Sequence, residues 1–169
     1  TYSACAKLFK RDAIEKTRFR TDIRINEDTF FVFQVLCEKP HFVGMNQNVY
    51  FYRNNPQSMS QAPFSDKYFD ILKVSDLKFK IIKENFPYLQ NYAENMLLKA
   101  RMNLLHILAQ RTKNEYRSTE KKLLQSIKKN RKSYMSATTE DDKWLFTIIS
   151  GLYPIYKCFY FYFRKKKES

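Results

Sequence analysis

The residues best suited to chemistry are two adjacent carboxylates, Glu27 and Asp28, at the start of a predicted helix. Asn26 can cap this helix, which we expect to run from Glu27 to about Glu38 and to stop before Pro40. Asp28 then falls in the first turn, where the helix dipole favours the ionised carboxylate. An ionised, positioned carboxylate can accept a proton from an attacking hydroxyl. Acidic residues are also common at helix starts for capping alone, so both roles stay open.

Basic residues elsewhere could meet an anionic ligand. Arg53 ends a strand-like segment, and its guanidinium offers a planar set of donors that suits a diphosphate. An ion pair between Arg53 and a nearby carboxylate is the alternative. Lys7 and Arg11 could line the same anion-binding cleft as Arg53, or they could be solvated charges on a helix face.

The cysteines and histidines lack the spacing of metal ligands. The three cysteines are isolated from one another, and neither His41 nor His106 has a ligand partner close to it in the sequence. We therefore predict no metal site in this sequence. Scattered thiols fit a reducing cytoplasm, where cysteine serves as a small apolar residue.

Three local elements would position these groups. We predict a short helix over Ala6–Glu15, the helix that carries Asp28, and a small β-hairpin. The hairpin would pair His41–Met45 with Val49–Arg53 across the turn residues 46–48.

The sequence beyond residue 62 predicts helices. Ser65 can cap a helix, with Phe64 and Phe69 forming a hydrophobic staple across it, and Pro87 ends that helix. A second long helix follows. The residues expected to form the buried faces of the two are Tyr68, Leu72, Ser75, Phe79, Ile82 and Phe86, and then Leu89, Tyr92, Ala93, Met96, Leu97, Ala100, Leu104, Ile107 and Leu108.

The C-terminal third carries most of the positive charge. Residues 111–169 hold fifteen Lys and Arg against six Asp and Glu, in a chain with a net charge of +14. We predict an exposed amphipathic helix over 111–133, anchored by Leu123, Leu124 and Ile127. A last, aromatic helix over 144–163 follows the capping residues 139–142.

Aromatic side chains beside a basic cluster suit a membrane interface. The residues we predict to contact an anionic membrane surface are Trp144, Arg164, Lys165, Lys166 and Lys167. The alternative is that this helix packs onto the rest of the protein or onto a second copy, as in a homodimer.

The composition excludes several classes. Hydrophobic residues make up 44% and aromatic residues 17%, which is too much for a disordered chain. With only 2 Gly, a propeller or a complete doubly wound nucleotide-binding sheet is disfavoured. The sequence opens without Met and without a signal-peptide pattern, and we interpret it as a fragment of a longer protein.

Four short motifs occur in order between residues 4 and 60. They are Lys7-Leu8-Phe9-Lys10-Arg11-Asp12, Arg18-Phe19, Glu27-Asp28-Thr29-Phe30, and Tyr50-Phe51-Tyr52-Arg53 followed by Ser58. In this order they resemble the C-terminal part of the catalytic domain in bacterial family 2 glycosyltransferases of the GT-A fold. One departure is the absence of a Gly that commonly precedes the Arg-Phe pair, where Glu15-Lys16-Thr17 stand instead.

The resemblance implies an inverting sugar transfer from a nucleotide-sugar donor to a glycan or lipid-linked acceptor in cell-surface polysaccharide synthesis. It implies that Asp28 is the general base and that Glu27 orients the acceptor or supports the loop. The donor and a divalent metal, Mg or Mn, would bind to a missing N-terminal half of the full-length parent. We expect no cofactor in this fragment, which alone would be inactive.

We therefore predict an α+β, predominantly helical chain. Residues 1–62 would be a C-terminal remnant of a GT-A domain, with helices and a small hairpin, and residues 63–169 a helical extension for membrane association or dimerisation. The protein would be cytoplasmic, at the inner face of the cell membrane. Two alternatives stay open: a basic helical nucleic-acid-binding module, although we expect no nucleic-acid partner, and a structural docking or dimerisation module.

Overall fold

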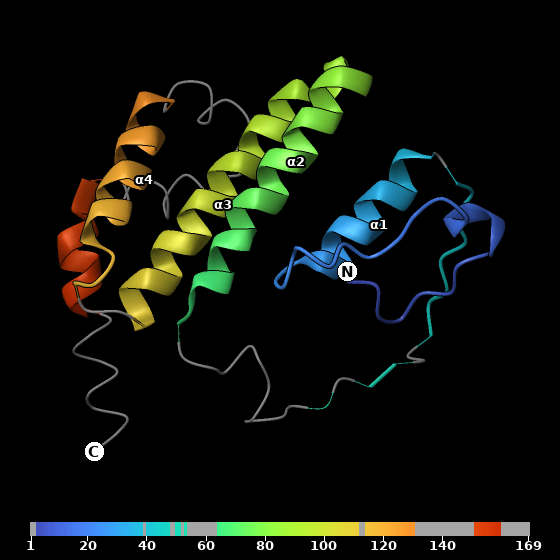
Figure 1. Cartoon of the computed structure of the whole chain (residues 1–169), viewed down its shortest axis with the longest axis horizontal. Helices are drawn as coiled ribbons and strands as arrows, with labels where there is room; N and C mark the ends of the chain where they lie inside the picture. The colour runs from blue at the N-terminus through green and yellow to red at the C-terminus, as the bar shows by residue number, and fades with distance from the viewer. Residues whose placement is uncertain are drawn as a thin grey trace. The chain divides into compact units, whose positions relative to one another are not determined.

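The computed structural model describes residues 3–38, 40–47, 50, 51, 53, 64–111, 114–130 and 151–159. The chain divides into two compact units, Thr1–Pro63 and Phe64–Ser169 (Figure 1). Both are helical, and no strand occurs among the described residues. The prediction of a predominantly helical chain is therefore confirmed, whereas its β component is not.

The first unit is built on one helix, α1 (Glu27–Cys37), which begins where the sequence predicted. The expected cap does not form. Asn26 has a left-handed backbone (φ 66°), and its side chain makes no capping hydrogen bond. A side-chain cap needs an extended backbone at that position, so only the Asn26 carbonyl contributes, accepting from the Phe30 N–H at 2.9 Å.

The predicted helix over Ala6–Glu15 is wrong. Only the 3-10 turn η1 (Asp12–Ile14) forms there. Ala6 adopts a positive φ of 56°, which a right-handed helix cannot contain.

The predicted hairpin is not confirmed. His41–Met45 is not in a strand, and the second arm falls partly on Val49 and Tyr52, which lie outside the described residues.

The core of the first unit forms on the inner face of α1. Phe31, Val32 and Val35 are buried, with Ala4, Phe9 and Ile14 packed against them. The segment before the helix therefore folds back onto it, although little of that segment is regular. Burial of these apolar side chains is the main stabilising contribution available to so short a unit.

The second unit begins with the 3-10 turn η2 (Asp66–Phe69), which leads into α2 (Asp70–Asn85). The hydrophobic staple is confirmed, because the rings of Phe64 and Phe69 meet edge to face with centroids 5.8 Å apart. Ser65 is extended, as an N-cap should be, but its side chain makes no capping hydrogen bond. The helix ends before Pro87, which opens the short 3-10 turn η3 (Pro87–Leu89), as the sequence predicted.

Helices α2 and α3 (Gln90–Arg111) lie side by side (Figure 1). The buried stripe of α2 is shifted from the predicted one towards Ile71, Val74 and Lys78, although Ser75 and Ile82 are buried as expected. Leu72 and Phe79 are only partly buried. Lys78 follows the stripe because its alkyl stem can cover apolar surface while its charged end reaches outward.

Helix α3 is the centre of the second unit. Its buried residues occupy more than one face, as the adjacent pairs Leu97 and Leu98, and Leu104 and Leu105, show. Such wide burial requires neighbours on several sides: α2 on one, and α4 (Arg117–Lys129) and the helical residues 151–159 on others. The first two residues of the predicted face, Leu89 and Tyr92, are exposed instead.

Helix α4 matches its prediction in part. Leu123 and Ile127 are buried and Leu124 is partly buried, as expected of the anchors. The helix is shorter than 111–133, and it also buries Glu120, which the sequence did not lead us to expect. Within the described ranges, no helix combines the length and the apolar character that crossing a bilayer requires.

Candidate functional site

The first turn of α1 presents the Asp28 carboxylate to several donors. The backbone N–H of Thr29 donates to Asp28 Oδ1 at 2.7 Å, and the Thr29 hydroxyl lies 3.3 Å from the same oxygen. Partial burial alone would raise the pKa of Asp28. Hydrogen bonds from the Ser3 hydroxyl, from Thr29 and from the backbone N–H of Ala4 outweigh that cost and lower the pKa. The carboxylate is therefore ionised at neutral pH.

Ser3 links the Asp28 carboxylate to Lys7, one of the predicted anion-binding residues. The Lys7 ammonium donates to the Ser3 backbone carbonyl at 2.6 Å, while the Ser3 hydroxyl bonds to Asp28. Lys7 is partly buried rather than fully solvated. Ser3 thus bridges Lys7 and Asp28 in the fold. The sequence did not reveal this proximity, because the two residues are twenty-one positions apart.

Cys5 and Tyr50 belong to the same cluster. Hydrogen bonds from Ser3 and then Tyr50 lower the pKa of the exposed Cys5 thiol, while the negative charge of Asp28 acts in the opposite direction. Tyr50 is the first residue of the fourth motif, so two motifs distant in the sequence converge near Asp28. Neither Ser3 nor Cys5 was singled out from the sequence, because neither has a diagnostic spacing.

Aromatic residues of the first two motifs pack against α1. The Phe19 ring stacks on Phe31 with centroids 4.3 Å apart, and the Phe9 ring meets Phe31 edge to face at 5.6 Å. Beside Phe19, Arg18 donates to the backbone carbonyls of Ile14, Glu15 and Thr17, which fixes the loop between motifs. The first two motifs therefore have a structural role that is independent of catalysis.

The structure gives no contact to Asp28 for the other predicted arginines, and the predicted membrane-contact residues lie outside its described part. Glu27 is the first residue of α1 and is partly buried, while Arg11 and Arg53 are exposed. In the described part of the chain, neither arginine forms a hydrogen bond or ion pair with Asp28. Trp144, Arg164, Lys165, Lys166 and Lys167 lie outside the described residues.

The described residues offer no metal-binding set. No group of three or more His, Cys, Asp or Glu side chains is gathered closely enough there to hold an ion. The groups around Asp28 are hydroxyl and amide donors, a thiol and a phenol, which do not fit a divalent-metal site.

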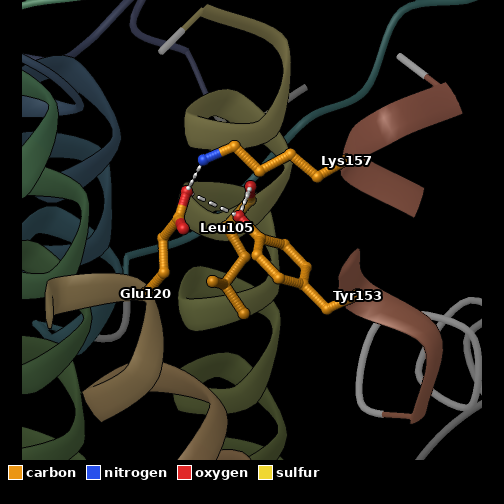
Figure 2. Close-up of polar contacts among 4 residues, drawn as sticks. All are labelled: Leu105, Glu120, Tyr153 and Lys157. Carbon is orange, nitrogen blue, oxygen red and sulfur yellow. Dashed lines mark hydrogen bonds and ion pairs between the residues drawn. The ribbon is translucent and has the colours of Figure 1, made fainter. Parts of the chain in front are cut away.

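A second polar cluster lies inside the second unit. Tyr153, from the helical residues 151–159, donates to Glu120 Oε1 at 3.1 Å and lies 3.2 Å from the Leu105 carbonyl of α3 (Figure 2). Lys157 completes the cluster through an ion pair with Glu120 at 2.5 Å. The Glu120 and Lys157 side chains are 7% and 16% exposed, so the pair is largely withdrawn from water.

Burial and the adjoining Glu120 carboxylate raise the pKa of Tyr153, which keeps its hydroxyl protonated and able to donate. Next to it, His106 of α3 contacts the Tyr156 hydroxyl through Nδ1, and the Gln110 amide lies 2.8 Å from Nε2. Burial lowers the pKa of His106, which favours the neutral imidazole. These bonds join α3, α4 and the helical residues 151–159 by polar contacts rather than by apolar packing alone.

The sequence contained a signal for this second cluster. Glu120 precedes Leu123 by three residues and Ile127 by seven, so it shares their helical face. A carboxylate on a buried face requires a buried partner. The identity of that partner, Lys157, depends on which helix packs alongside, and spacing alone does not give it.

The comparisons with known proteins yield no relative: no family model, no curated protein and no solved structure matches this chain.

The lowered pKa of Asp28 gives a first test. The folded pKa lies below the ordinary value of 3.8, so the ionised carboxylate contributes stability above that value. This contribution is lost as the pH falls through the folded pKa. Carboxyl-detected NMR titration should give a midpoint for Asp28 below 3.8. A midpoint above 3.8 would mean that desolvation exceeds the hydrogen bonds.

The Glu120–Lys157 pair gives a second test. Lys157→Met leaves a buried carboxylate without its counter-ion, which should lower the free energy of unfolding by about 3–5 kcal/mol. Glu120→Gln/Lys157→Met should lose less, because no unpaired charge remains. Urea unfolding of the full chain measures both, with Lys128→Met, on the exposed face of α4, as the control. A Lys157→Met variant as stable as this control would contradict a structural role for the pair.

Proposed function

We propose that this chain supplies the acceptor-activating part of an inverting glycosyltransferase similar to the bacterial family 2, GT-A type enzymes. The observation that supports it most is the Asp28 carboxylate, ionised and fixed at the start of α1 by Ser3, Ala4 and Thr29. The packing of Phe9 and Phe19, from the first two motifs, against Phe31 of α1 adds to this support, as does the hydrogen bond between Tyr50 and Cys5.

In the proposed reaction, Asp28 accepts the proton of an acceptor hydroxyl as that oxygen attacks the anomeric carbon of a nucleotide sugar. A lowered pKa keeps the carboxylate ionised but makes it a weaker base. Positioning of the acceptor hydroxyl therefore contributes the larger share of the rate acceleration. The acceptor would be a glycan or a lipid-linked glycan of the cell surface. Glu27, next to Asp28, would orient it.

The nucleotide diphosphate leaves with negative charge that cations must stabilise. Arg53 is the first candidate, because its exposed guanidinium can form paired hydrogen bonds with phosphate oxygens. Lys7 and Arg11 are further candidates, and Lys7 is the nearer to Asp28 through Ser3. In this proposal the donor and its Mg or Mn ion bind in an N-terminal half of the full-length protein, and these 169 residues do not turn over alone.

Substitution of Asp28 tests the proposed base. In the full-length protein, Asp28→Asn should lower kcat by roughly 10²–10⁴-fold, because the amide cannot accept the proton but keeps the shape of the side chain. Transfer is measured as release of nucleoside diphosphate with a panel of nucleotide sugars.

Asp22→Asn is the matched control, since Asp22 is an exposed carboxylate paired locally with Arg20 at 2.8 Å. It should retain turnover. Circular dichroism and the melting temperature of both variants separate a lost base from a lost fold. Unchanged turnover in a folded Asp28→Asn protein would refute the assignment.

A further inference from the structure

The helical residues 151–159 expose their apolar side chains and turn their polar ones inward. Leu152, Ile155 and Phe159 are 51%, 65% and 56% exposed. Spacings of three and four residues place them on one face of the helix. The inward side is held by Tyr153 and Lys157 through Glu120. A helix that packs on the protein with one face and meets water with the other normally has its apolar side chains inward and its polar ones outward. This segment has the reverse arrangement, so its outer face is suited to an apolar medium.

Helix α4, joined to this segment through Glu120, carries a basic outer face. Its exposed cations are Arg117, Lys121, Lys122, Lys128 and Lys129. Glu120 is the only acidic residue of α4, and it is buried against Lys157. None of the five cations forms an ion pair with an acidic side chain in the described part of the chain. The second unit therefore combines exposed apolar side chains with positive charge that has no described counter-ion.

We propose that Leu152, Ile155 and Phe159, with the basic face of α4, bind the surface of an anionic lipid bilayer. The three side chains would enter the boundary between headgroups and acyl chains while the lysines contact anionic headgroups. The segment would lie in the interface rather than cross it. This inference concerns different residues from the proposed sugar transfer and does not depend on it.

Two other partners fit these observations less well. A nucleic acid would use the lysines, but Leu152 and Ile155 have no ring to stack on a base and gain nothing from phosphate. A second copy of the chain would need about 800 Å² of buried surface on each partner, and three side chains offer only a small part of that. Two copies of a basic α4 would also repel each other. An anionic bilayer satisfies the apolar and the charged components together.

Vesicle flotation of the full chain tests the proposal. The chain should float with vesicles of phosphatidylcholine and phosphatidylglycerol, should bind much less to phosphatidylcholine alone, and should be released by salt. Leu152→Ser/Ile155→Ser should weaken partition at least tenfold. Lys121→Gln/Lys128→Gln should weaken it roughly 25-fold, from roughly fivefold for each basic residue near an anionic surface.

Two matched controls separate this surface from general stickiness and general charge. Leu8→Ser/Val43→Ser removes two highly exposed apolar side chains from the first unit, and Lys80→Gln/Lys83→Gln removes two exposed lysines from α2. Both should bind as the unmodified chain does. Near-ultraviolet circular dichroism, sensitive to the buried Tyr153, checks that each variant is folded.

The proposal is overturned by absent binding, by equal binding to neutral vesicles, or by controls that weaken binding as much as the test variants. Two further results would overturn it in favour of another partner. One is tight, salt-sensitive binding to a nucleic-acid duplex without vesicle binding. The other is a dimer, detected by analytical ultracentrifugation, that Leu152→Ser/Ile155→Ser abolishes while the chain ignores vesicles.

Discussion

A carboxylate taken out of water must be met by donors, and this constraint organises the second unit around Glu120. Its side chain comes from the inner face of α4, where its neighbours on the helix are Leu123 and Ile127. Tyr153 and Lys157 supply the donors, and both come from the helical residues 151–159. Once these two residues turn inward, helical geometry turns Leu152 and Ile155 outward. The exposed apolar face is thus a consequence of how the buried charge is neutralised.

The same constraint has another outcome in the first unit. Asp28 is only partly buried, and the donors that hold it are the Ser3 hydroxyl, Thr29 and the Ala4 amide rather than a salt-bridging cation. Neutral donors fix the position of the carboxylate and keep it ionised, yet leave its charge without a counter-ion among the described residues. Glu120, sealed and paired with Lys157, suits a structural role. Asp28, accessible and unneutralised by these donors, suits a role that receives a proton or binds a cationic or hydroxylic ligand.

The features that the sequence predicted correctly are the local ones. The start of α1, the Phe64–Phe69 staple, the break at Pro87 and the anchors of α4 follow from residues within one or two turns of each other. The predictions of a helix through Ala6 and of a side-chain cap at Asn26 were wrong because both residues have a positive φ, which most residues avoid. The residue types at these positions do not indicate such a backbone angle.

Features that depend on tertiary contacts were harder to predict. The shift of the α2 stripe towards Ile71 and the wide burial of α3 reflect which helices pack alongside, which periodicity within one helix does not specify. The Lys7–Ser3–Asp28 arrangement required the chain before α1 to fold back onto it. Asp28 itself could be selected from helix position and motif order, but its donors could not.

Stereochemistry is the most direct test of the proposed role of Asp28 as a base in a direct displacement. In the proposed reaction one carboxylate activates the acceptor and no covalent intermediate forms, so the acceptor oxygen would attack the anomeric carbon from the face opposite the leaving diphosphate. NMR of the product made by the full-length protein should therefore show an anomeric configuration inverted relative to the nucleotide-sugar donor. A product with retained configuration would contradict the account.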